Sequence, residues 1–187
     1  MRSPSPFNPL ASSRGPEERP LSATPARTGA ADAGLLLLRL TFGLLMAGHG
    51  AQKLFGLFGG PGFAKTGKGF DAMGYHPGEA YGLAAGLSEL LGGLGFALGL
   101  LTPLAAAALI GVMINAMVMV TGAHGLWMSD NGVEYNVAIA VVALAVAAIG
   151  PGRLAADRPF RWGKGGWTEA AVALGLAGVG TAIVLSL

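Results

Sequence analysis

LLLLRLTFGLLMAGHGAQKLFGLF, residues 35–58, is an apolar run interrupted by the ionisable residues Arg39, His49 and Lys53. A helix needs about 20 mostly apolar residues to cross the hydrocarbon core of a bilayer, so this run is long enough to span it. Further candidate spans follow at 80–101, 104–122, 134–149 and 168–187. The span at 134–149 is short, and we expect polar residues at its N-terminal end to extend it. The pattern predicts an all-α, polytopic membrane protein.

The composition supports a membrane protein and excludes several kinds of chemistry. Of the 187 residues, 52% are hydrophobic and 12% are charged, whereas a soluble domain carries about 25% charged residues. The chain has no cysteine, which excludes thiol relays, disulfides, iron–sulfur clusters and cysteine-based zinc sites. We predict no metal site. The formal net charge of +2 is too small to favour nucleic acid as a partner.

The distribution of basic residues predicts the orientation in the membrane. Four arginines lie in residues 1–33, and Arg153, Arg158, Arg161 and Lys164 follow the fourth span, whereas residues 59–79 contain only Lys65 and Lys68. Cytoplasmic loops carry the excess of lysine and arginine. We therefore expect the N-terminus and the 150–167 segment in the cytoplasm, and the C-terminus outside if the fifth segment crosses.

Charged residues of the first two spans share faces with small residues. Helical periodicity places Arg39, His49 and Lys53 on one stripe, with Gly43, Ala47 and Gly50 beside it. In the second span Glu89 lies on the same face as Gly82, Gly86 and Gly93. Small residues allow helix backbones to approach closely in membranes, so we expect these two faces to pack together. Arg39 lies near the cytoplasmic boundary, where we expect its side chain to extend towards water.

The rise of a helix places several polar residues at similar depths in the outer half of the membrane. His49, Glu89 and Asn115 share one layer, and Lys53 and Glu134 lie just above it. We expect His49 to face Glu89, and Lys53 to form an ion pair or a shared ligand contact with Glu134. Ionisable groups inside a membrane indicate a functional site by default, although polar residues also stabilise helix packing, and both interpretations stay open here.

Several motifs together resemble the DoxX family of membrane proteins. They are Arg39–Gly43, Gly48–Gly56, Glu89 with Gly93, Gly99–Pro103, Asn115 with Ala116, Gly132–Asn136, and Gly150–Arg153 with Asp157. The resemblance implies a four-helix transmembrane bundle at 34–158. It leaves 1–33 as a disordered cytoplasmic tail and 159–187 as a basic linker with an appended fifth transmembrane helix. It also implies a location in the bacterial plasma membrane.

The resemblance to DoxX extends to the DoxD subunit of thiosulfate:quinone oxidoreductase, which implies a membrane component of a redox system with partner enzyme subunits. In that function Glu89 and His49 are the candidate catalytic residues. Lys53, Asn115, Glu134 and Tyr135 are the candidate residues for binding a quinone or a small sulfur or anionic substrate. Two alternatives stay open: a non-catalytic scaffold that docks partner enzymes, and a small-solute or proton-coupled transporter.

Overall fold

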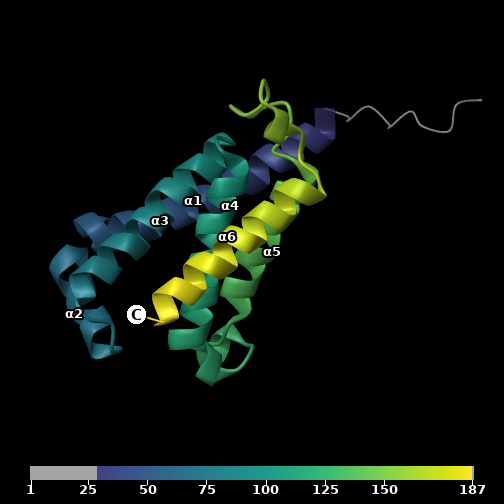
Figure 1. Ribbon diagram of the computed structural model, residues 1–187. Coiled ribbons are helices and arrows are strands. Elements are labelled where there is room, and N and C mark those ends of the chain that lie inside the picture. The colour runs from purple at the N-terminus through teal and green to yellow at the C-terminus, as the bar shows by residue number, and fades with distance from the viewer. Residues whose placement is uncertain (1–28, 187) are drawn as a thin grey trace, which may run out of the picture.

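The computed structural model describes residues 29–186, and these contain helices and no strands (Figure 1). The long helices are α1 (Gly29–Phe55), α3 (Gly78–Leu98), α4 (Thr102–Ala116), α5 (Glu134–Ile149) and α6 (Trp167–Ser186). The helix α2 (Gly62–Ala72) is shorter, and α4 continues through a π-helical turn, η2 (Met117–Thr121), into η3 (Gly122–His124). Short 3-10 turns are η1 (Leu57–Gly59), η4 (Met128–Asp130) and η5 (Arg161–Lys164). The all-α, polytopic membrane architecture is confirmed.

Four helical segments are long and apolar enough to cross a membrane. They are Gly29–Phe55, Gly78–Leu98, Thr102–His124 and Trp167–Ser186. Helix α5 is apolar but has only 16 residues, so it spans about 24 Å at the usual helical rise and is shorter than the hydrocarbon core. The five apolar segments therefore lie where the sequence predicts them, and α5 is the short one.

Helices α1 and α3 pack closely because glycines face each other at their contact. A Cβ atom added at Gly43 would lie 2.6 Å from the Gly93 carbonyl oxygen, and one at Gly50 would lie 2.6 Å from that of Gly86. Both distances are too short for a real side chain, so the contact requires glycine. The predicted packing of the two small-residue faces is confirmed.

Helices α4, α5 and α6 pack against one another in the second half of the molecule (Figure 1). The turn from α3 to α4 is tight, with Gly99 and Leu101 at positive φ and Pro103 in the first turn of α4, so the two helices form a hairpin. The core contains Phe96, Leu109 and Ile139 and includes buried alanines of α6. The C-terminal helix is thus part of the packed structure.

The segment between α5 and α6 folds over one end of the bundle, which we call the basic end; the opposite end is the α2 end. The backbone N–H groups of Ala156 and Asp157 donate to the carbonyl oxygens of Leu98 and Gly99. The buried Asp157 carboxylate accepts from the backbone N–H of Leu101 and Thr102 and from Trp162 Nε1, at 2.9, 2.7 and 2.9 Å. These bonds satisfy amide groups at the start of α4.

Two expectations need correction. The prediction of a disordered tail at 1–33 is wrong for 29–33, which are the first turn of α1, while residues 1–28 lie outside the described residues. The buried Asp32 accepts from the backbone N–H and from Nε of Arg153, and this long-range pair holds the turn in place. The segment 59–79, expected as a loop, contains α2, whose residues Thr66 and Gly67 are buried.

Candidate functional site

A pocket of about 390 Å³ lies in the half of the bundle nearer the α2 end. Its walls come from the N-terminal half of α3, from α4 with the π-helical turn η2, and from the last turns of α6. Residues at the end of α2 and just after it close one side. In Figure 1 the C-terminal end of α6 lies beside α2, in agreement with the residues that share this pocket. Most of the lining is apolar, as is typical of small-molecule sites.

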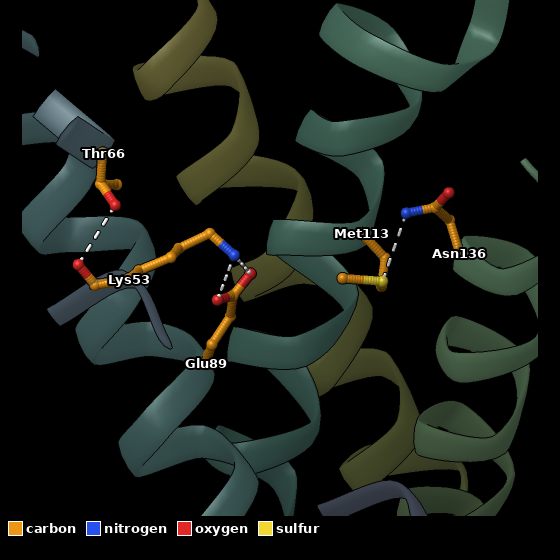
Figure 2. Close-up of polar contacts among 5 residues, drawn as sticks. All are labelled: Lys53, Thr66, Glu89, Met113 and Asn136. Atoms are coloured by element: carbon orange, nitrogen blue, oxygen red, sulfur yellow. Dashed lines mark hydrogen bonds and ion pairs between the residues drawn. The ribbon is translucent and has the colours of Figure 1, made fainter. Parts of the chain in front are cut away.

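The charged wall of the pocket is an ion pair between α1 and α3. Lys53 Nζ donates to Glu89 Oε1 at 2.8 Å and to Oε2 at 2.6 Å (Figure 2). The Glu89 side chain is 5% exposed and that of Lys53 is 28% exposed. Thr66 of α2 donates its hydroxyl to the Lys53 carbonyl oxygen at 3.1 Å and so fastens α2 to the end of α1. Both charges are thus held at the pocket by three helices.

The expected ion pair between Lys53 and Glu134 is wrong, because Lys53 pairs with Glu89. Glu134 is the first residue of α5, and its carboxylate accepts from the backbone N–H of Met128 at 3.0 Å. A side chain tilts towards the N-terminus of its own helix. Lys53 therefore tilts deeper into the bundle and Glu89 tilts towards the α2 end, so the two meet, whereas Glu134 tilts into the loop before α5.

A second polar contact lines the pocket where α4 meets α6. Asn115 Nδ2 donates to the Gly111 carbonyl oxygen at 2.9 Å and to Thr181 Oγ1 at 3.3 Å. Thr181 in turn donates to the same Gly111 oxygen at 3.3 Å. Asn115 Oδ1 is buried and, within residues 29–186, has no hydrogen-bond partner. Asn115 was predicted as a binding residue from its depth, and the structure places it in the pocket wall with Lys53 and Glu89.

His49 and Tyr135 meet each other and lie outside the pocket lining. Their ring centroids are 6.3 Å apart in an edge-to-face arrangement between α1 and α5. His49 interacts electrostatically with Glu89, and the expectation that the two side chains face each other stays a prediction. The predicted polar layer is therefore divided: Lys53, Glu89 and Asn115 line the pocket, and His49 with Tyr135 lies behind it.

Aromatic residues from the α2–α3 connection form another wall of the pocket. The ring of Tyr75 lies 5.6 Å from that of Phe70 and 4.8 Å from that of Tyr81. Burial, with a smaller contribution from Tyr81, raises the pKa of Tyr75, so its phenol stays protonated and can donate a hydrogen bond. Sequence reasoning did not select these residues, because aromatic residues at membrane boundaries ordinarily form interfacial belts.

Thr181 of α6 is also a pocket residue that sequence reasoning did not select. It is the one polar side chain in the otherwise apolar stretch 170–185, and this is the signal that could have identified it. The signal is weak, because a threonine hydroxyl inside a helix can bond to the backbone of its own helix.

Arg39 occupies a separate polar site at the basic end, and the expectation that it extends towards water is wrong. The side chain is fully buried, and Nη2 donates to the Leu154 carbonyl oxygen at 2.6 Å. Its Nε and Nη1 have no hydrogen-bond partner within the described part of the chain, and Asp157 interacts with it electrostatically. The 150–166 segment covers this end of α1 and shields the guanidinium from water.

The chemistry of the pocket is that of a neutral, mostly apolar site with a few fixed polar groups. Lys53 can donate to a ligand, the Glu89 carboxylate can accept from one, and the aromatic wall can contact a ring. Within residues 29–186 no three His, Cys, Asp or Glu side chains are grouped so as to hold a metal ion.

Comparisons with known proteins agree with the helical architecture. Residues 34–122 match the family model DoxX. No curated protein and no solved structure matches the chain. The matched residues include most of α1, all of α2, α3 and α4, and the Lys53–Glu89 pair, whereas α5 and α6 follow the matched range. The helices are therefore those of a polytopic membrane protein, and residues 34–122 of it match the DoxX family.

Proposed function

We propose that this protein is a membrane component of a redox system and binds the head group of a quinone in the pocket between α3, α4 and α6. The observation that carries the proposal is the Lys53–Glu89 pair in the wall of an apolar pocket of about 390 Å³. A quinone ring is flat and apolar, with carbonyl oxygens at its edge. The aromatic wall of Phe70, Tyr75 and Tyr81 suits the ring, and Lys53 suits a carbonyl oxygen.

The ion pair favours a neutral ligand over a small anion such as a sulfur oxyanion. Glu89 accepts from Lys53 through both carboxylate oxygens, so its negative charge balances the lysine. An anion that enters this pocket would lose its hydration shell. The positive charge of Lys53 is already balanced by Glu89 and would not compensate for that loss. A neutral molecule that accepts one hydrogen bond from Lys53 meets no such cost.

The residues of the pair have distinct roles in this proposal. A bound quinone supplies an acceptor for two electrons and two protons. Lys53 donates a hydrogen bond that orients the ring, and Glu89 exchanges protons at the same oxygen. His49, behind Glu89 and within electrostatic range of it, connects the carboxylate with the α1–α5 contact.

A partner subunit supplies or accepts the electrons in this proposal. The chain has no cysteine and therefore no thiol that could carry them. Arg158, Arg161 and Lys164 are exposed at the basic end, which we place in the cytoplasm, and they suit an acidic surface of such a partner.

Bound quinone in the purified protein tests the proposal. We expect organic extraction and mass spectrometry to recover quinone from the wild-type protein and from Lys68→Met, which changes an exposed lysine of α2 outside the pocket. We expect Lys53→Met to lose it. Equal recovery from all three proteins, or retention of added short-tailed quinone by Lys53→Met at wild-type affinity, would contradict a quinone site here. A protein that binds no quinone but recruits enzyme subunits would instead be a scaffold.

A further inference from the structure

A groove of about 390 Å³ runs along the surface between α5 and α6, which pack side by side (Figure 1). We call it the α5–α6 groove, and its lining residues differ from those of the candidate functional site. Two turns of each helix line it, within 141–148 and 167–174, and every lining side chain is apolar. Half of these residues are alanines, whose small side chains leave the hollow. The groove therefore suits a hydrocarbon chain along its length.

One end of the groove opens at the basic end of the bundle, where α5 ends and α6 begins. Trp167 lines this opening and is 90% exposed. A Cβ atom added at Gly150, directly after α5, would lie 2.7 Å from the carbonyl carbon of Lys164. Lys164 therefore lies at the opening, and Arg161 is at the start of the same turn, η5. Both side chains are exposed.

The positive charge at this opening is not balanced by nearby carboxylates. Among residues 29–186, neither Lys164 nor Arg161 forms an ion pair. Glu169 is close in sequence, but its carboxylate lies against Gly166, and helical periodicity places it on the face of α6 opposite the groove. Asp157 is buried and bonded to backbone amides of the α3–α4 turn. The opening thus presents two cations at the rim of an apolar groove.

We propose that the α5–α6 groove binds an anionic phospholipid, with one acyl chain along the groove and the phosphate group at Lys164 and Arg161. From 167 to 174 the helix rises about 10 Å, which lies within the hydrocarbon of one leaflet, about 15 Å deep. Tryptophan is typical of the level between hydrocarbon and head groups, which agrees with Trp167 at the opening. Basic pockets between membrane helices on the cytoplasmic side bind anionic head groups. The inference is independent of the proposed quinone site.

Two other occupants suit the observations less well. Copies of this chain cross the membrane in the same direction, so a second copy in the groove would bring its own basic end beside Lys164 and Arg161. Like charges placed side by side are unfavourable, whereas a phosphate group compensates them. An acidic surface of a partner protein would use the cations but would leave the groove empty. Filling the groove therefore distinguishes a lipid from a partner surface.

The test uses the full-length protein in vesicles of equal parts phosphatidylglycerol and phosphatidylcholine. The protein is extracted in mild detergent, and the retained lipids are quantified by mass spectrometry. We expect the wild-type protein to retain phosphatidylglycerol in excess. Lys164→Gln should lower the ratio of the two lipids about fivefold, the usual effect of one basic residue at a membrane surface. Lys68→Gln, an exposed lysine at the α2 end, is the control and should keep the wild-type ratio.

A second variant fills the groove and leaves the charges in place. Ala145 is exposed in the groove, so Ala145→Leu should fold normally and lose most of the retained phosphatidylglycerol. Ala138→Leu, at an exposed position of the same helix outside the groove, should retain the wild-type amount. Thermal unfolding verifies that each variant is folded, and Arg161→Gln and Ala171→Leu replace any that is not.

Three results would overturn the lipid site. The first is a wild-type protein that retains both lipids equally, and the second is an unchanged ratio in the folded Lys164 variant. The third is wild-type retention by the folded Ala145 variant, which would assign the cations to a partner surface instead. A dimer that dissociates in Ala145→Leu, detected by crosslinking in the vesicles, would assign the groove to a second copy and overturn the lipid site as well.

Discussion

Gly43 on α1 and Gly93 on α3 face each other so closely that a Cβ atom on either would lie within 2.6 Å of the other's carbonyl oxygen. The contact brings the two helices together along the face that carries Lys53 and Glu89. The ion pair in the pocket wall therefore depends on glycines that contact no ligand.

Gly43→Ala should force α1 and α3 apart and lower the free energy of unfolding by about 1–3 kcal/mol, the usual cost of overpacking. Thermal unfolding in detergent measures the change. Gly48→Ala on the same helix is the matched control, because a Cβ there has nothing within 4 Å. Equal stability of the Gly43 and Gly48 variants would contradict the close contact.

Removing one member of the Lys53–Glu89 pair should cost more than removing both. Lys53→Met leaves the buried Glu89 without its partner, and we expect a loss of about 3 kcal/mol in unfolding free energy. The double variant Lys53→Met with Glu89→Leu should recover most of that loss, because no uncompensated charge remains. Unfolding of the two single variants and the double variant measures the coupling. Additive effects would show that the residues do not interact.

Glu89→Gln separates a role in proton exchange from a role in packing. The amide keeps the size of the side chain and can still form a hydrogen bond with Lys53, so the protein should reach the membrane in near-normal amount. Quinone-linked turnover in membranes with the partner complex should fall by at least tenfold, since general acid–base catalysis contributes about 10²–10⁴ in rate. Full turnover by this variant would eliminate Glu89 as a proton-exchanging group.

Asp157→Ala should release the 150–166 segment from the bundle. The carboxylate binds two backbone amides at the start of α4 and the Trp162 indole, and its loss also leaves Arg39 without the nearby negative charge. We expect a loss of about 2 kcal/mol, at the upper end for a helix cap, with a change in Trp162 fluorescence. Asp130→Ala, an exposed acid in η4, is the control. An unchanged unfolding midpoint for Asp157→Ala would argue against this capping role.

The orientation rests on the distribution of basic residues and can be tested with reporter fusions. We expect reporters at positions 70, 128 and 187 to be outside and one at position 160 to be in the cytoplasm. A cytoplasmic reporter at 187 with the other three as stated would mean that α6 does not cross the membrane. Reversal of all four would invert the orientation.

The sequence was sufficient to predict the apolar helices because lipid imposes length and hydropathy on each segment by itself. It did not reveal α2, since GFAKTGKGFDA at 62–72 is short, rich in glycine and polar, and becomes helical by packing on the ends of α1 and α3. Counting residues along each span predicted that Lys53, Glu89 and Asn115 lie at similar depths. It paired Lys53 with Glu134, whereas the structure pairs Lys53 with Glu89. Depth follows from counting residues, whereas pairing depends on the direction of each side chain along its helix.

Arg39 marks another limit of what one sequence can reveal. An arginine near the end of a span ordinarily reaches water, and only the fold of residues 150–166 shows that this one is covered. The same holds for Asp32, whose partner Arg153 lies far along the chain. The periodic pattern of residue types within one helix does not show which distant segment of the chain contacts it.

The pocket is lined by residues from inside and from outside the part of the chain that matches the DoxX family. Its charged wall, Lys53 and Glu89, lies inside this part, whereas Gly180, Thr181 and Val184 come from α6, beyond it. A helix outside the matched range thus holds the amide of Asn115 and closes one side of the cavity. Substitutions in the last turns of α6 can therefore alter which molecules the cavity accepts while the charged pair and its glycine contact stay unchanged.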